Sequence, residues 1–575
     1  MTQTVSFGPH ARHVDGALDR LQRQRVLARI WDRDASLWTA DAAAQDAIRN
    51  RLGWLSIAGV MAQQTQPLRA FAQEIRDAGF THVLLLGMGG SGLFSEVCRQ
   101  IFGAAAGHPD LAVLDTTDPT AIRRAQDHAP ITQLLAIISS KSGTTSEVSA
   151  LSRYFYDLFG KAGGQAGAHC VVITDEGTPL AEQAKAWKVR RCFTHGPTSG
   201  GDVGGRFSAL TYFGLVPASL LGVDVQELLA RALAMYERCG ADVPAQDNPA
   251  AELGAALGAF AAAGRDKLTV LCAPSLSSFG TWVEQLIAEN LGKQGRGIVP
   301  IVGEPLREPS AYGADRLFVE LQPAGQRDPS IDRLTAALAS AGQPVIRIHW
   351  QDAYDLGGEV AKWSVATAIA GWMLGVNPFD EPNVTESKDR TKALIAAYAK
   401  DRRLPEEPAL FVDGDLAVYG GVSGGGANAL GPCLAGLLRQ AHPSDYLSVL
   451  SFLPRTLALD DAVSAIRNAL ARGLPNATML GFGPRYLHST GQLFKGGPDT
   501  GLFLLLTGDD PTDLSIPGEP FTFSVLKQAQ ALGDFQAMRQ RSRRILRIHL
   551  RGELSRSAVQ LLSAVEEALA SSSRR

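Results

Sequence analysis

The feature that most constrains this fold is the pairing of fully apolar runs with turns rich in glycine or hydroxyl residues. In THVLLLGMGGSG, residues 81–92, an apolar run leads into a glycine-rich turn, and LLAIIS, residues 134–139, leads into serines and threonines. An amphipathic helix is expected after each turn. Apolar runs without alternation indicate strands buried on both faces, as in a parallel sheet covered by helices. The sequence therefore predicts an α/β protein built on doubly wound parallel sheets.

The rhythm of strand and helix recurs three times along the 575 residues, a length that exceeds what one hydrophobic core holds. Apolar runs restart near residue 267 and again near residue 409, where ALFVDGDLAVYG opens the third cycle. The best boundary candidate is the segment DRRLPEEP, residues 401–408. The predicted organisation is a helical N-terminal region, two similar α/β units and a third α/β unit: residues 1–76, 77–225, 226–400 and 401–575.

Composition and charge exclude several classes of protein. The net charge of -3 gives no electrostatic case for a nucleic-acid or membrane partner. No segment approaches the roughly 18 uninterrupted apolar residues of a membrane span, and the N-terminus does not resemble a secretory signal, so we expect a cytoplasmic protein. The six cysteines have no CxxC spacing, which favours buried reduced thiols over disulfides or a metal site.

Two loops at the ends of predicted strands are suited to bind an anion. GMGGSG, residues 87–92, has backbone N–H groups that could hold a phosphate, although the glycines could equally serve a tight turn. With Asp115 it also fits the dinucleotide pattern G-x-G-x-x-G. SSKSGTTSE, residues 139–147, supplies hydroxyl donors where ligands of open α/β sheets collect, unless it is only a helix cap. One phosphate held by both loops explains them better than a nicotinamide cofactor does, so a dehydrogenase is the least favoured function.

Two further segments could carry chemistry. Arg206 in GGRFS follows paired glycines, which would let the guanidinium approach a ligand and stabilise an oxyanion, or it could lie in an ordinary loop. Glu284 and Glu289 belong to a predicted helix that runs into a Gly-Lys turn. By spacing alone, either glutamate could be a solvated helix residue.

Five motifs together resemble one family. GMGGSG, SSKSGTTSE, GGRFS, AENLGK and GVNPFDEPNV occur in the order found in phosphoglucose isomerases, over about residues 87–388. ARIWDRDASLW and LHSTGQLFKGGP resemble more particularly the isomerase part of bifunctional transaldolase/phosphoglucose isomerases. The resemblance implies tandem doubly wound (flavodoxin-like) sugar isomerase domains. It also implies the interconversion of glucose 6-phosphate and fructose 6-phosphate through ring opening and a cis-enediolate, with no cofactor and no metal.

The resemblance also implies roles for individual residues. Glu289 corresponds to the catalytic base, Arg206 to the arginine that stabilises the enediolate, and Lys388 to a lysine that helps to open the ring. Glu381 stands where the family usually has glutamine, and this extra anion would alter the contacts with the sugar ring or be neutralised by Lys388. The residues expected to bind the sugar or its phosphate are Gly90, Ser91, Ser140, Lys141 (through its backbone), Ser142 and Thr145.

The ring-opening histidine is the main departure from the family pattern. The family places it soon after GEP, but GEPLREPSAYGADR, residues 303–316, contains no histidine. His488 in the third unit is the best substitute, because imidazole can move a proton near neutral pH; it could also be a structural histidine. Lys495 in the same segment is a weaker candidate for a substrate or phosphate contact.

Two other functions stay open at this point. The phosphate loop would also accept another hexose or amino-hexose phosphate as the substrate. Sugar isomerase domains also serve as regulators, so a non-catalytic sugar-phosphate sensor is the alternative from a different class. The expected partner is a small sugar phosphate, and the family resemblance makes a homodimer possible.

Overall fold

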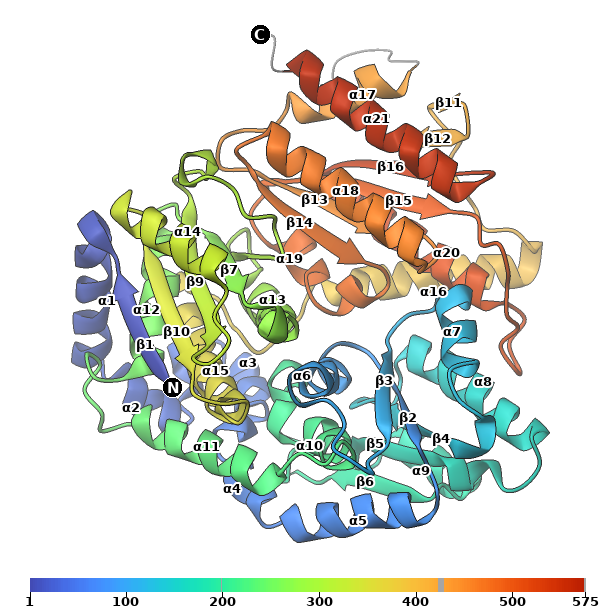
Figure 1. Ribbon diagram of the computed structural model, residues 1–575, viewed down its shortest axis with the longest axis horizontal. Helices are drawn as coiled ribbons and strands as arrows, with labels where there is room; N and C mark the ends of the chain where they lie inside the picture. Colours follow the sequence, from blue (N-terminus) through green and yellow to red (C-terminus); the bar gives the residue numbers. More distant parts are fainter. Residues whose placement is uncertain (198, 422–428, 573–575) are drawn as a thin grey trace.

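The computed structural model describes residues 1–197, 199–421 and 429–572, which form three open sheets with helices packed against their faces (Figure 1). The first sheet has the order β3-β2-β4-β5-β6, and its strands pair in parallel. This is the flavodoxin-like arrangement, in which the first strand of the unit lies between the second and the third. The strands are β2 (His82–Gly87), β3 (Asp110–Leu114), β4 (Leu134–Ser139), β5 (Cys170–Asp175) and β6 (Arg191–His195).

The second sheet repeats that order with four parallel strands and adds an antiparallel edge strand from the N-terminus. Its strands are β1 (Thr2–Ser6), β7 (Lys267–Cys272), β8 (Val299–Val302), β9 (Arg316–Pro323) and β10 (Val345–Trp350). The N-terminal region is therefore not purely helical, because β1 pairs with β10. No apolar run predicted β1, since this edge strand is short, polar and partly exposed.

The third sheet has the same parallel order once more, with β13 between β14 and β15 and with β16 next to β15. Its strands are β11 (Phe411–Asp413), β12 (Leu416–Tyr419), β13 (Tyr446–Ser451), β14 (Ala477–Phe482), β15 (Gly501–Gly508) and β16 (Arg544–Leu550). The segment ALFVDGDLAVYG forms the β11–β12 hairpin, which turns at Gly414 with a φ of 58°. An Asp-Gly pair between apolar runs is the common sequence signal of such a turn.

Helices cover the sheets, which confirms the predicted α/β class. The N-terminal segment contains α1 (Ala11–Arg23), α2 (Val26–Trp31), α3 (Ala42–Arg49), α4 (Ile57–Ala62) and α5 (Thr65–Asp77). The first unit contains α6 (Leu93–Phe102), α7 (Pro119–Gln126), α8 (Ser146–Lys161), α9 (Pro179–Trp187) and α10 (Tyr212–Leu220). The second contains α11 (Val225–Arg238), α12 (Pro249–Ala262), α13 (Ser277–Leu291), α14 (Pro329–Ser340), α15 (Asp355–Leu374) and α16 (Val384–Asp401). The third contains α17 (Leu430–Leu438), α18 (Leu457–Gly473), α19 (Gly491–Gly496), α20 (Phe523–Gln540) and α21 (Leu554–Ser572).

One hydrophobic core joins the N-terminal helices with the first and second units, whereas the third unit has a core of its own. Helix α15 runs through the shared core and is buried almost all round, as expected of a helix that is apolar on every face. Although long and apolar, it does not qualify as a membrane span, and neither does any other helix in the described ranges.

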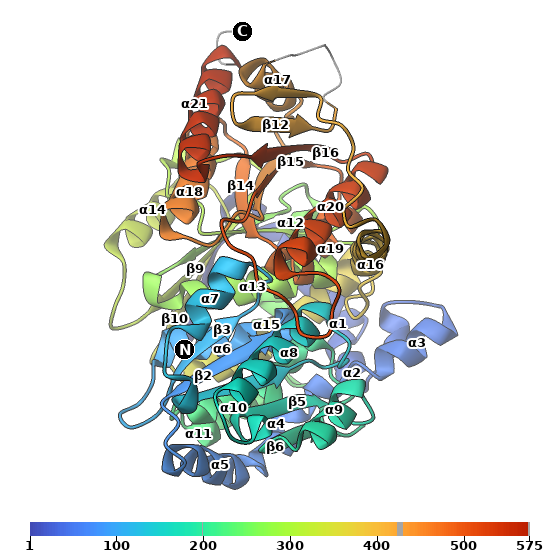
Figure 2. The ribbon, with the colours of Figure 1, turned by 90° about the vertical axis from the view of Figure 1, so that its right-hand side faces the viewer.

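The third unit docks on the other two through α19 and α20 (Figures 1 and 2). The buried face of α20 is unusual because it carries polar side chains. Lys527 Nζ lies 2.9 Å from an oxygen of Asp118 in the first unit and also pairs with Asp510. A buried cation between two carboxylates fixes the orientation of the units, because separating them would leave charges unpaired in the interior.

Replacing Lys527 with methionine should therefore destabilise the protein strongly. The variant leaves Asp118 and Asp510 facing each other without a cation, and we expect the free energy of unfolding in urea to fall by about 3–5 kcal/mol. Lys185→Met is the matched control, because Lys185 forms an ion pair with Glu182 that is exposed to solvent and should add little to stability. If the two substitutions lower the free energy of unfolding equally, the buried cluster of Lys527 does not stabilise the docking of the third unit.

Candidate active site

The two anion loops lie side by side because β2 and β4 are adjacent strands. Gly87 at the end of β2 pairs with Ser139 at the end of β4, so the loops that follow emerge at the same edge of the sheet. The hydroxyl of Ser139 donates a 2.6 Å hydrogen bond to the carbonyl of Ser91, which ties the loops together. This edge is the topological switch point of the first sheet, where ligands of such folds bind.

The loop after β4 holds its hydroxyl groups close to one another at the N-terminus of α8. Ser140 Oγ lies 3.1 Å from Thr145 Oγ1, and Ser142 Oγ lies 3.0 Å from Thr144 Oγ1. Gly143 turns the loop with a φ of +66°, which favours glycine. Hydroxyl donors at the N-terminus of a helix form an anion-binding arrangement.

The side chain of Lys141 points away from this loop. Its Nζ forms a 2.7 Å ion pair with Asp175 and donates to the carbonyls of Gly200 and Gly201. The ammonium group is thus used to hold neighbouring loops, which is compatible with the expectation that Lys141 would contribute its backbone alone.

The glycine-rich loop approaches the arginine segment closely. A Cβ atom on Gly90 would lie 1.9 Å from the carbonyl oxygen of Gly205, so no larger residue fits between the two backbones. Ser208 Oγ donates to the Gly90 carbonyl at 3.2 Å. This contact brings Arg206, the second residue of the 3₁₀ helix Gly205–Leu210, to the edge of the first sheet.

Arg206 lies at the centre of a buried cluster with two glutamates. It is 5% exposed, and its Nη1 lies 3.3 Å from Glu289 Oε1 and 2.8 Å from Glu381 Oε2. Nε donates to Asn290 Oδ1 at 2.7 Å, and Nη2 donates to the carbonyl of Asp380 at 3.2 Å. These bonds fix the plane of the guanidinium, so that it can meet a developing negative charge without first reorienting.

The two glutamates differ in the direction of their pKa shifts. Burial raises the pKa of Glu289 above its ordinary value; Arg206 opposes this effect and the negative charge of Glu381 adds to it. Burial would also raise the pKa of Glu381, but Arg206 and Arg51 hold it at about 2. Glu381 is therefore the permanent anion of the cluster. Glu289, 7% exposed, has the environment of a tuned acid–base group.

Gln285 joins this cluster to the third unit. It lies one turn before Glu289 on α13, and its Nε2 donates to Glu289 Oε2 at 3.2 Å and to the carbonyl oxygen of His488 at 2.9 Å. Sequence reasoning missed Gln285, although its position four residues before the predicted base placed both side chains on one face of the helix.

His488 pairs with a glutamate from the first unit. Its Nε2 lies 2.8 Å from Glu147 Oε1, and Gln530 on α20 donates to the same oxygen at 2.7 Å. Burial would raise the pKa of Glu147, but His488 and the hydrogen bonds around the carboxylate hold it at about 2. The carboxylate of Glu147 therefore fixes the orientation of the His488 imidazole. Glu147 ends the stretch SSKSGTTSE, yet its role depends on a contact with a residue 341 positions away.

A cavity of about 490 Å³ opens between the hydroxyl loop, His488 and α16. Lys388 lies on its rim as an exposed side chain opposite the loop. The predicted residues Ser142, Thr145, Lys388 and His488 are thus gathered around one space, together with Glu147. Arg206, Glu289 and Glu381 do not line this cavity, and they are joined to it through Gln285 and the backbone of His488.

The expectation that Lys495 contacts the substrate is wrong in this structure. Its side chain is buried, and Nζ forms a 2.7 Å ion pair with Asp534 of α20. Tyr486 and Ser387 also donate hydrogen bonds to Asp534, so Lys495 belongs to a structural cluster behind His488.

No three His, Cys, Asp or Glu side chains form a metal-binding group within the described part of the chain.

Comparison with known proteins places this geometry in a family. The chain is 30% identical over 405 residues to a probable glucose-6-phosphate isomerase of Natronomonas pharaonis, covering 64% of this chain and 90% of the relative. The chain belongs to the glucose-6-phosphate isomerase family. A member from Rubrobacter xylanophilus is 28% identical over 375 residues, covering 56% of this chain and 84% of the relative. No family model matches the chain.

Solved structures agree with the fold. A glucose-6-phosphate isomerase of Chlamydia trachomatis has a TM-score of 0.55 at 17% identity, covering 69% of this chain and 89% of that one. A protein of Thermus thermophilus described as hypothetical has a TM-score of 0.58 at 23% identity, covering 68% of this chain and 99% of that one. The resemblance to phosphoglucose isomerases is confirmed, and the finer resemblance to the isomerase part of bifunctional enzymes stays a prediction.

Proposed function

We propose that this protein interconverts glucose 6-phosphate and fructose 6-phosphate. The observation that carries the proposal is the buried carboxylate of Glu289, held between Arg206 and Gln285 in a chain of this family. The named relatives are described as glucose-6-phosphate isomerases, and the hydroxyl loop beside α8 suits the phosphate of either sugar.

Ring opening comes first in the proposed mechanism. The C1–O5 bond of the cyclic sugar breaks, O5 gains a proton and the O1 hydroxyl loses one. His488, oriented by the ionised Glu147, is the proposed proton donor to O5. Lys388 on the rim of the cavity is the second group that could assist this step.

Proton transfer between the two carbons follows. Glu289 takes the C2 proton of the open aldose, the electron pair shifts to the C1 carbonyl oxygen, and a cis-enediolate forms. Arg206 offsets the negative charge on that oxygen, and the proton then returns to C1 while the O2 proton passes to O1. The raised pKa of Glu289 makes it a stronger base than an exposed glutamate.

The arrangement also bears on the alternative functions. A sensor needs only the phosphate loop, whereas the buried pairing of Glu289 with Arg206 is suited to catalysis. A dehydrogenase would need Asp115 free for a ribose hydroxyl, but Asp115 is paired with Arg485 of the third unit. Another hexose phosphate is the closest competing substrate, because Glu381 replaces the glutamine that the family usually has.

The cellular setting is part of the same proposal. Phosphorylated sugars carry charges that keep them inside cells, which supports a cytoplasmic enzyme. His488 of the third unit lines the same cavity as the hydroxyl loop of the first unit. The homodimer that the family resemblance implies stays a proposal.

Glu289→Gln should abolish turnover while the protein stays folded. Glutamine keeps the shape of the side chain but cannot accept the C2 proton, so kcat in a coupled assay with fructose 6-phosphate should fall by about 10²- to 10⁴-fold. Glu227→Gln, on the exposed face of α11, is the matched control and should retain wild-type activity. If the wild-type protein does not isomerise fructose 6-phosphate but acts on mannose 6-phosphate or glucosamine 6-phosphate, the substrate assignment is wrong.

Glu381→Gln should shift the pH profile. The base must be ionised, so kcat/KM rises with pH through the pKa of Glu289, which burial raises above the ordinary value of a glutamate. Removing the charge of Glu381 takes away one cause of that raised pKa and lets Arg206 pair with Glu289 alone. The acid limb of kcat/KM should therefore move to lower pH. An acid limb that stays at the same pH, or moves to higher pH, would mean that Glu289 is not the titrating base.

A further inference from the structure

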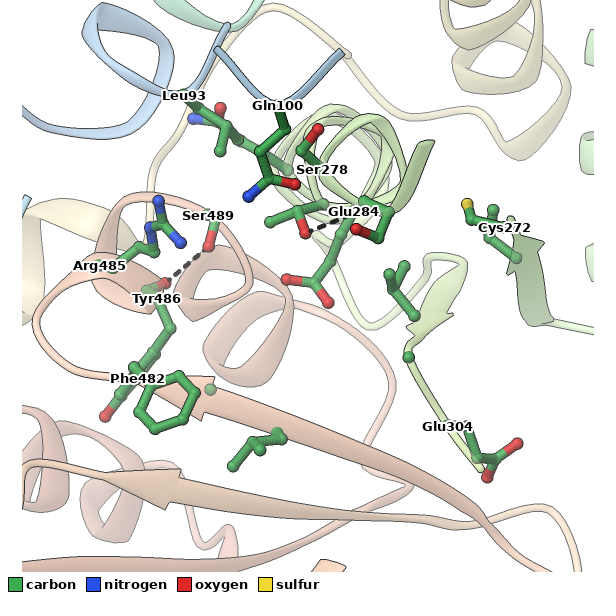
Figure 3. A pocket seen from close by; sticks show the side chains of 18 of the residues that line it. Leu93, Gln100, Cys272, Ser278, Glu284, Glu304, Phe482, Arg485, Tyr486 and Ser489 are labelled. Atoms are coloured by element: carbon green, nitrogen blue, oxygen red, sulfur yellow. Dashed lines mark hydrogen bonds between the residues drawn. The ribbon is translucent and has the colours of Figure 1, made fainter. Parts of the chain in front are cut away.

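A second cavity, of about 360 Å³, lies where the three units meet (Figure 3). It opens at the carboxyl ends of β7 and β8 and at the end of β14, and the N-terminal residues of α13 line it. Figure 3 shows Glu284 extending from α13 into this space. Ligands of doubly wound sheets collect at the carboxyl ends of the strands, and small-molecule sites are frequent at domain interfaces.

This cavity is distinct from the one beside the hydroxyl loop but adjoins the same residues. Gly89 and Gln285 line it, and a Cβ atom on Gly89 would lie 2.9 Å from both Gln285 Nε2 and the His488 carbonyl. Gln285 therefore separates the second cavity from Glu289. A molecule bound in this cavity would contact the side chain that holds the proposed base and the His488 segment.

Two arginines bring positive charge to the cavity, and one of them is not neutralised. Arg485 pairs with Asp115. Arg467 of α18 has no ion-pair partner among the described residues, and its Nε has no hydrogen-bond partner there. Burial lowers the pKa of Arg467, and the carboxyl groups of Glu304 and, when it is ionised, Glu284 oppose this shift. A partly buried guanidinium of this kind is well suited to bind an anion.

A buried hydroxyl also lacks a partner. Ser278, in the first turn of α13, is 5% exposed, and its Oγ makes no hydrogen bond to any described residue. Buried polar groups are usually satisfied, so an unsatisfied hydroxyl lining a cavity indicates that a ligand or water completes it. The N-terminus of this 15-residue helix adds a partial positive charge beside that hydroxyl.

The carboxylates around the cavity do not oppose an anion as strongly as their number suggests. Glu304 is paired with Arg316 and Arg307, and Asp115 is paired with Arg485. Burial raises the pKa of Glu284 to about 8, with Arg485 and Arg467 opposing the shift, so near neutral pH this side chain is mostly an uncharged hydrogen-bond donor. Burial raises the pKa of the Cys272 thiol to about 12, so it also stays neutral.

We propose that the second cavity binds a small tetrahedral dianion, such as inorganic phosphate or the phosphoryl group of a metabolite, through Arg467, Arg485 and Ser278. The binding does not depend on the isomerase reaction, because the three groups lie outside the hydroxyl loop and the cluster of Glu289.

Equilibrium dialysis with radiolabelled sulfate tests the proposal, since sulfate keeps its charge throughout the neutral range. The wild-type protein should bind two sulfate ions, one at the hydroxyl loop and one at the second cavity. Arg467→Gln should weaken the affinity for the sulfate in the second cavity by about 10- to 100-fold, the loss expected for a hydrogen bond to a charged group. The double substitution Ser142→Ala, Thr145→Val should weaken the affinity for the sulfate at the hydroxyl loop and leave the affinity of the second cavity unchanged.

Matched variants make the outcome decisive. Arg472→Gln removes an exposed arginine from the same helix and should leave both sulfate ions bound. Ser278→Ala, which changes no charge, should weaken the same sulfate as Arg467→Gln and replaces that variant if it does not fold. If 3-phosphoglycerate displaces sulfate from the second cavity at lower concentration than inorganic phosphate does, the ligand is a phosphorylated metabolite. If both displace it at the same concentration, the ligand is the free anion. Unchanged binding in both Arg467→Gln and Ser278→Ala would overturn the proposal.

Discussion

The candidate active site depends on the contact between α13 and the third unit. The amide of Gln285 donates to both Glu289 and the carbonyl of His488, so one side chain connects the proposed base to the proposed ring-opening residue. Burial is the main cause of the raised pKa of Glu289, and Gln285 holds its carboxylate by a hydrogen bond. Without the third unit, His488 and the hydrogen bond that Gln285 donates to it would be absent.

Helix α20 explains how the third unit can hold His488 accurately. Gln530 fixes Glu147, the partner of His488, while Asp534 binds Tyr486 and Lys495 on either side of the histidine in sequence. Lys527 anchors the same helix to the first unit. The polar groups on this helix are costly to bury unless they are paired, so their pairing selects one docking arrangement. The docked third unit places His488 beside Glu147 and the hydroxyl loop of the first unit.

Much of the fold could be predicted, because strands buried on both faces leave unbroken apolar runs such as those of β2 and β4. The short polar edge strand β1 leaves no such signal. Motifs located the loops that meet at the switch point, but contacts over long sequence separations could not be deduced. Glu147 meets His488 from 341 residues away, and Lys495 is turned inward by Asp534, which no local pattern reveals.

The most direct test of proton transfer through Glu289 is to run the reaction in D₂O and follow both sugars by NMR. We predict that the wild-type protein introduces deuterium at C1 of fructose 6-phosphate and at C2 of glucose 6-phosphate over repeated turnovers. Glu289→Gln should introduce it at neither position. If the wild-type protein interconverts the sugars many times while both positions keep their original hydrogen, the hydrogen passes directly between the carbons and proton transfer through Glu289 is contradicted.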